Sequence, residues 1–117
     1  MKVNFRTIEN EEKYFAWMKS HADRPCALCE CPPLQIFSHW KLITDTFPYD
    51  VIANTHDMIV PLRHVDDTNL TNEERLELAT IKISLGTAYD MFIENSHHRR
   101  SIHEHFHVHA IILKEKI

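Results

Sequence analysis

Histidines occupy alternate positions near the end of the chain, from residue 103 to residue 109, and an apolar tail follows as far as residue 113. Phe, Val and Ile between and after them favour a strand. Side chains of a strand alternate between its two faces, so three imidazoles share one face: His105, His107 and His109. Imidazole nitrogens need partners, and a row of them predicts a site for metal, phosphate or proton chemistry. The alternative is an exposed polar face of an edge strand.

The apolar pattern predicts two helices. Thr7 and the acidic residues after it mark the start of the first helix, which carries an aromatic stripe and should end near residues 22–24, before Pro25. The stripe has spacings of three and four and consists of Tyr14, Trp17, Met18 and His21. Thr71 and Glu74 form a capping box that opens a long helix over residues 72–94.

The remaining apolar segments predict strands. Residues 34–44 are β-prone and predict one strand or two short strands with a break, and residues 45–50 are a proline-containing loop. Residues 56–61 predict a short strand that a proline ends. With helices grouped against a mostly antiparallel sheet, the fold class is α+β.

Composition narrows the class of protein. A length of 117 residues predicts a single domain over residues 1–117, and a net charge of −4 gives no electrostatic case for nucleic-acid or membrane-surface binding. No apolar stretch reaches the roughly 20 residues of a membrane span, and the N-terminus lacks the apolar segment of a signal peptide, so we expect a cytoplasmic protein. The one glycine, Gly86, excludes a glycine-rich phosphate loop.

A Cys-x-x-Cys pair follows the first helix. Cys26 and Cys29 can turn back in a tight loop, so that both sulfurs meet one zinc ion. A redox pair and unligated thiols are the alternatives, although a thioredoxin-like pair opens a helix after a strand, and this one follows a helix and precedes two prolines. Cys31, two residues after Cys29, is expected to take no part in the site.

Four segments together resemble the histidine triad superfamily, in particular its zinc-containing members. Residues 105–111 match the pattern His-φ-His-φ-His-φ-φ, where φ is apolar, and residues 56–64 resemble the earlier strand, in which a histidine precedes an apolar strand, a proline and a second histidine. The long helix lies between them. The Cys-x-x-Cys pair is similar to that of zinc-containing members, and residues 45–50 resemble a Phe-Pro segment found in several branches, including galactose-1-phosphate uridylyltransferases.

The resemblance implies a domain with about five antiparallel strands, an N-terminal helical extension over residues 1–25, and a homodimer. It also implies a nucleotide hydrolase or nucleotidyl transferase that acts at the α-phosphate through a covalent nucleotidyl-histidine. His107 would be the nucleophile, and His109 and His56 would orient the ring and the phosphate. A neutral imidazole is a good nucleophile, and two displacements are easier than one. A structural zinc would be held by Cys26, Cys29, His64 and His105.

The segment before the triad departs from the family pattern. Members carry a glycine-rich loop there, whereas residues 95–104 contain no glycine. Asn95 lies about where a nucleotide-binding asparagine is expected, and Ser101 is one residue further from the triad than the usual serine. We expect Arg99 or Arg100 to replace the backbone amides as the phosphate partner, because guanidinium binds phosphate bidentately. The alternative is that both arginines are solvated.

Two further residue assignments and two alternative functions complete the expectations. By analogy, Asp45 would hold a ribose hydroxyl, and His103 is expected at the rim of the pocket or on the surface. Two other functions stay open: an inactive zinc-stabilised nucleotide-binding or regulatory module, and a metal-dependent hydrolase that uses the triad as open-site zinc ligands.

Overall fold

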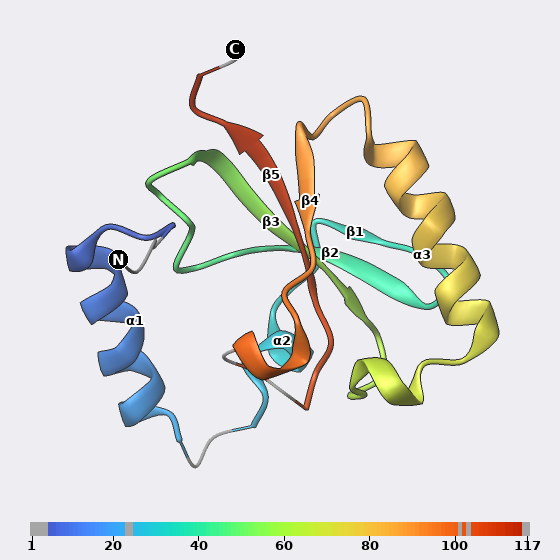
Figure 1. Ribbon diagram of the computed structural model, residues 1–117. Helices are drawn as coiled ribbons and strands as arrows, with labels where there is room; N and C mark the ends of the chain where they lie inside the picture. Colours follow the sequence, from blue (N-terminus) through green and yellow to red (C-terminus); the bar gives the residue numbers. More distant parts are fainter. Residues whose placement is uncertain (1–4, 23–24, 101, 103, 116–117) are drawn as a thin grey trace.

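The computed structural model describes residues 5–22, 25–100, 102 and 104–115. Its centre is a five-stranded antiparallel sheet with the strand order β1-β2-β3-β5-β4 (Figure 1). The strands are β1 (Gln35–Ile36), β2 (Trp40–Thr44), β3 (Ala53–Pro61), β4 (Met91–Ile93) and β5 (Val108–Leu113). The helices are α1 (Ile8–Ser20), α2 (Ala27–Glu30) and α3 (Asn72–Leu85), with short 3-10 helices η1 (Asp67–Asn69) and η2 (His97–Arg99).

The two faces of the sheet are covered by different helices. On one face α3 packs against a buried apolar cluster that includes Trp40, Ile59 and Phe106. On the other face α2 places Leu28 against Met58 and two further strand residues, Ile43 and Val60. Because strand side chains alternate, the face opposite α3 is the one that displays the histidines.

The first helix lies away from α3, across the sheet (Figure 1). Its Thr7 cap is confirmed, since the side chain accepts a hydrogen bond from the backbone of Asn10. The helix ends at Ser20, before the predicted end. The helix contacts the loop between β2 and β3: Asn10 donates to the Pro48 carbonyl, and the Tyr14 ring lies 5.4 Å from that of Phe47.

The long helix begins where it was predicted and ends earlier. Both hydrogen bonds of the capping box between Thr71 and Glu74 are present. The prediction that the helix continues to residue 94 is wrong: α3 ends at Leu85, Gly86 is its C-cap, and residues 91–93 form β4. Its buried stripe is narrow: Leu78 and Ile81 are buried, whereas Leu76 and Ile83 lie on the opposite side of the helix and are exposed.

The strand prediction for the histidine segment holds for its second half. β5 begins at Val108, so His105 and His107 precede the regular strand, although the alternation of faces extends to them. The segment 34–44 forms two short strands, β1 and β2, and residues 45–50 form the predicted loop. Ser101 and His103 lie outside the described residues.

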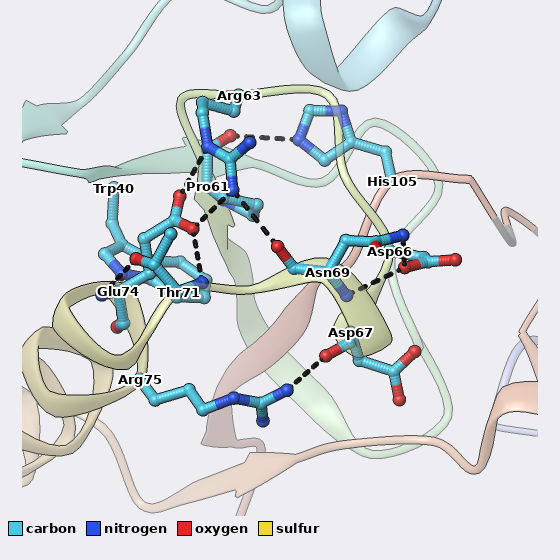
Figure 2. A network of polar contacts seen from close by, with 10 residues as sticks. All are labelled: Trp40, Pro61, Arg63, Asp66, Asp67, Asn69, Thr71, Glu74, Arg75 and His105. Atoms are coloured by element: carbon cyan, nitrogen blue, oxygen red, sulfur yellow. Dashed lines mark hydrogen bonds and ion pairs between the residues drawn. The ribbon is translucent and has the colours of Figure 1, made fainter.

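A polar network joins the end of β3 to the start of α3 (Figure 2). Arg63 donates to both carboxylate oxygens of buried Glu74, at 2.7 and 3.1 Å, and to the backbone of Asn69. The indole of Trp40 donates to the Glu74 carbonyl at 2.9 Å. This network fixes the turn after Pro61, and that turn carries His64.

Candidate active site and metal centre

A cavity of about 330 Å³ opens on the histidine face of the sheet. It is lined by His107 and His109, and the loop between β2 and β3 contributes Asp45 and Tyr49. The first helix adds aromatic side chains at its margin. Pockets of this size, mostly apolar with a few convergent polar groups, are typical of small-molecule sites.

His107 has a defined tautomer. Its Nδ1 lies 3.0 Å from the carbonyl oxygen of His105, and a carbonyl can only accept, so Nδ1 carries the proton. The lone pair of a neutral ring is then on Nε2. Burial lowers the pKa of His107 below its ordinary value, so the ring is neutral at physiological pH. A buried neutral imidazole in a cavity is chemically suited to nucleophilic attack.

His56 and His109 are joined by a short hydrogen bond. The backbone N–H of Tyr49 donates to His56 Nδ1 at 2.9 Å, and His56 Nε2 lies 2.7 Å from His109 Nδ1. Burial lowers the pKa of His56 to about 3 and that of His109 to about 2, with smaller effects from Arg6 and from neighbouring imidazoles. Both rings are therefore neutral, and the direction of their hydrogen bonds can be assigned.

Asp45 borders the same group. Its Oδ1 accepts the backbone N–H of Phe47 at 2.8 Å, and its Oδ2 lies 3.3 Å from His56 Nε2. Burial raises the pKa of Asp45 to about 6. Asp45 lines the cavity, as a residue that contacts ribose would.

The four predicted metal ligands come together from three separate segments of the chain. Cys26, Cys29, His64 and His105 offer ligand atoms that all lie within 4.8 Å of one another. His105 Nδ1 is 3.5 Å from Cys26 Sγ and 3.3 Å from Cys29 Sγ, and His64 Nδ1 is 3.3 Å from Cys29 Sγ. Cys31 is not in this group. It packs beside Leu28 and lines the cavity.

These distances fit a tetrahedral zinc ion. Zn–S and Zn–N bonds of about 2.3 and 2.05 Å at a tetrahedral angle place sulfur and nitrogen about 3.6 Å apart. His105 Nε2 donates to the Pro61 carbonyl at 2.9 Å, which leaves Nδ1 as the ligand atom (Figure 2). The buried Lys41 stabilises the cysteine loop, because its ammonium group donates hydrogen bonds to the carbonyls of Cys29 and Cys31 at 3.0 and 2.8 Å. Two thiolates and two imidazoles would complete a structural zinc site.

A second group of possible ligands, Asp45, His56 and His109, does not have this geometry. Two nitrogens on one tetrahedral zinc ion lie about 3.3 Å apart, whereas His56 and His109 approach to 2.7 Å. That separation is a hydrogen bond. Among the described residues no group of possible ligands joins all three triad histidines, because His105 faces the cysteines. The open-site zinc reading therefore has no support in this geometry.

The two candidate phosphate arginines differ. Arg100 is buried and has partners within the protein. Its guanidinium pairs with Asp67 at 3.0 Å, donates to the Asn95 carbonyl at 2.9 Å and lies over the Phe106 ring. Arg99 is exposed, whereas both arginines line the cavity. Of the pair, Arg99 is the one that can reach a ligand without breaking an internal ion pair.

Several residues that line the cavity were not assigned to the site from the sequence. Arg6 lies over the rings of Tyr14 and Tyr49, with its guanidinium carbon 4.3 and 5.0 Å from their centroids. Trp17 and Phe47 add aromatic surface. Their types were visible, but only the docking of α1 on the loop brings them to the histidines.

Comparison with known proteins identifies the fold. No family model and no curated protein sequence matches the chain. Among solved structures, a HIT family hydrolase from Legionella pneumophila Philadelphia 1 is 22% identical with a TM-score of 0.54, covering 74% of this chain and 91% of that one. A histidine triad protein from Clostridium difficile is 17% identical with a TM-score of 0.50, covering 88% and 91%. The predicted fold is thus confirmed: the chain has the fold of the histidine triad proteins.

In the described part of the chain, no helix is both long and apolar enough to cross a membrane.

Proposed function

We propose that the protein is a nucleotidyl hydrolase or transferase of the histidine triad type, acting at the α-phosphate of a nucleotide. The observation that carries the proposal is the tautomer of His107, whose Nδ1 is bound to a backbone carbonyl at 3.0 Å and whose Nε2 is left for attack. The fold it shares with a HIT family hydrolase supports the same conclusion.

The reaction would take place in two displacements. His107 Nε2 attacks the α-phosphorus, the bond from phosphorus to the leaving group breaks, and a nucleotidyl-histidine forms. Water or phosphate then attacks the same phosphorus, the P–N bond breaks, and the ring returns to its neutral form. Charge on the phosphoryl oxygens would be stabilised by donors around the cavity. Arg99 is placed to contribute as such a donor, and Asp45 would bind the ribose.

Zinc would be held by Cys26, Cys29, His64 and His105, where it would be structural. The carbonyl that orients His107 belongs to His105. A ligand residue therefore also fixes the tautomer of the proposed nucleophile. Loss of the metal should disturb catalysis through this carbonyl, without the metal touching the substrate.

The test is a search for the covalent intermediate. The protein would be incubated with nucleoside phosphoramidates, dinucleoside polyphosphates and nucleotide sugars, and the intact mass and the peptides would be measured after rapid acid-free quenching. We expect one nucleotidyl group on His107 and none in His107→Asn. His39→Asn, at an exposed histidine in the turn before β2, is the matched control and should still form the adduct.

Absence of an adduct and of turnover, with nucleotide binding intact, would refute the enzymatic proposal in favour of a binding or regulatory module. Zinc content tests the other alternative, a metal-dependent hydrolase that uses the triad as zinc ligands. Metal loss in His107→Asn would mean that the triad itself binds the ion.

The resemblance also predicts a homodimer. Leu76 and Ile83, seven residues apart on the same side of α3, are 71% and 81% exposed, and exposed Met91 lies on the edge strand β4. Their exposure supports an apolar contact between two copies. Light scattering after size exclusion should give twice the chain mass, and a monomer for the double variant Leu76→Glu, Ile83→Glu. A wild-type monomer at high concentration would contradict the prediction.

A further inference from the structure

Tyr49 is the residue beside the triad whose role is not explained by the proposed reaction. It is buried, its ring lies 4.5 Å from that of His56 and 4.7 Å from that of His109, and it lines the cavity. Its hydroxyl contacts His109 Nε2 at 3.1 Å and Asn95 Nδ2 at 3.1 Å. The directions of these two hydrogen bonds decide where its proton points.

The directions follow from one backbone N–H. The amide of Tyr49 can only donate, so His56 Nδ1 accepts and the single proton of the neutral His56 ring is on Nε2. That proton is donated to His109 Nδ1, 2.7 Å away. The neutral His109 ring then carries its own proton on Nε2, and it donates to the Tyr49 hydroxyl oxygen.

Asn95 supplies the second hydrogen bond to the same oxygen. Its Nδ2 is also 3.5 Å from His109 Nε2, but that nitrogen already carries a proton and cannot accept. The amide therefore donates to Tyr49, 3.1 Å away. A phenol oxygen that accepts two hydrogen bonds has its O–H left to donate. Tyr49 lines the cavity, where such a donor would meet a ligand.

We propose that the Tyr49 hydroxyl is a hydrogen-bond donor to a phosphoryl oxygen of the bound nucleotide. The inference rests on the proposed function for the identity of the ligand. It assigns His56 and His109 an indirect part, since their fixed tautomers turn the hydroxyl proton toward the ligand. Phosphoryl oxygens are strong acceptors, and hydrogen bonds to charged groups are the stronger class.

The experiment compares ligands with and without phosphate. Binding of the 5′-monophosphates of the four common ribonucleosides, and of the matching nucleosides, would be measured by calorimetry on wild-type protein and Tyr49→Phe. We expect Tyr49→Phe to weaken the monophosphate that binds best by about tenfold or more, with the nucleoside changed less than twofold. Tyr89→Phe is the matched control: its hydroxyl is bound to Asp57, and Tyr89 packs in the core on the α3 face.

A second measurement reads the tautomers. Nitrogen-15 spectra of the imidazole rings should show protons on Nε2 of His56 and His109 and on Nδ1 of His107 in wild-type protein. In Tyr49→Phe the His109 Nε2 proton should shift and exchange faster, because its acceptor is gone, while His107 should change little.

Three results would overturn the inference: equal loss of nucleotide and nucleoside affinity, unchanged nucleotide affinity, or no preference of the wild-type protein for the monophosphate. The adduct on His107 tests the proposed reaction independently of the role of Tyr49. If the adduct forms and Tyr49→Phe binds normally, only the role of Tyr49 is refuted. If no adduct forms and Tyr49→Phe loses phosphate affinity, only the turnover is refuted.

Discussion

Glu74 offers a quantitative test of how the turn that carries His64 is held. Its carboxylate accepts from the Thr71 backbone at 2.9 Å and from Arg63 at 2.7 and 3.1 Å, and its side chain is 3% exposed (Figure 2). Replacement by alanine removes half of a capping box, about 1 kcal/mol, and hydrogen bonds to a charged partner, about 2 kcal/mol. We expect Glu74→Ala to lower the free energy of unfolding by about 3 kcal/mol.

Urea unfolding at pH 7, followed by circular dichroism, measures this loss. A change of 3 kcal/mol corresponds to a lower Tm by about 10 °C in a domain of this size. Glu73→Ala is the control, because Glu73 has the same charge in the same helical turn and is exposed. If the two variants agree within about 0.5 kcal/mol, the usual spread of surface substitutions, the network does not hold the turn.

The pH dependence gives an independent check on Glu74. The hydrogen bond from Arg63 is the largest cause that lowers the pKa of Glu74, to about 2. A carboxylate with a lowered pKa adds stability above its unfolded pKa and loses it as the pH falls toward the folded value. The shift corresponds to about 3 kcal/mol, and solvent at the half-exposed Arg63 reduces it to about 2 kcal/mol. The stability difference between wild type and Glu74→Gln should therefore be constant above pH 5 and vanish toward pH 2.

Three further predictions concern the site. Elemental analysis should find one zinc per chain, lost in Cys26→Ser and retained in His107→Ala. Cys31→Ser is the matched control and should also keep zinc. Loss of zinc from Cys31→Ser would mean that the proposed set of ligands is wrong. With chelator present, the free energy of unfolding should decrease by at least about 1.4 kcal/mol for each unit by which the pH is lowered near pH 5. The reason is that unfolding lets His56 and His109 take up two protons while Asp45 releases one. A flat profile between pH 6 and pH 4.5 would contradict the buried neutral rings. Turnover should persist below pH 6.5, because the pKa of His107 is lowered and its neutral form is the reactive one. A loss of rate centred at or above pH 6.5 would show that protonation of His107 does not cause the loss.

Local patterns determined much of the fold from the sequence. Both predicted helix starts depend on side-chain caps within three residues, Thr7 to Asn10 and Thr71 to Glu74, and both are present. The alternation around the triad also holds, because a period of two depends on the backbone alone. The end of α3 could not be obtained in this way, since residues 91–93 pair with β5 and that pairing joins residues 16 to 20 positions apart.

The metal group could be named from the sequence by its resemblance, and the cysteine pair by its spacing. Its geometry depends on the folded chain, because His105 lies 79 residues from Cys26 and only the sheet and the turn after β3 bring their ligand atoms within 3.5 Å. The two arginines illustrate the limit: the sequence offered Arg99 or Arg100 as the phosphate partner and could not show that Arg100 is paired. Its partner Asp67 has no sequence signal, and the ion pair appears only when η1 and the segment before the triad meet.

Tertiary structure alone decided the directions of the hydrogen bonds. Four alternating histidines have eight ring nitrogens, and nothing in their spacing states which of them carries a proton. One backbone amide at Tyr49 and one carbonyl at His105 assign His56, His109 and His107 in turn. A tautomer depends on what each ring nitrogen touches, and the ring contacts of His56, His107 and His109 join residues up to 60 positions apart. The sequence thus determined that imidazoles share a face, and the fold decided what each one does there.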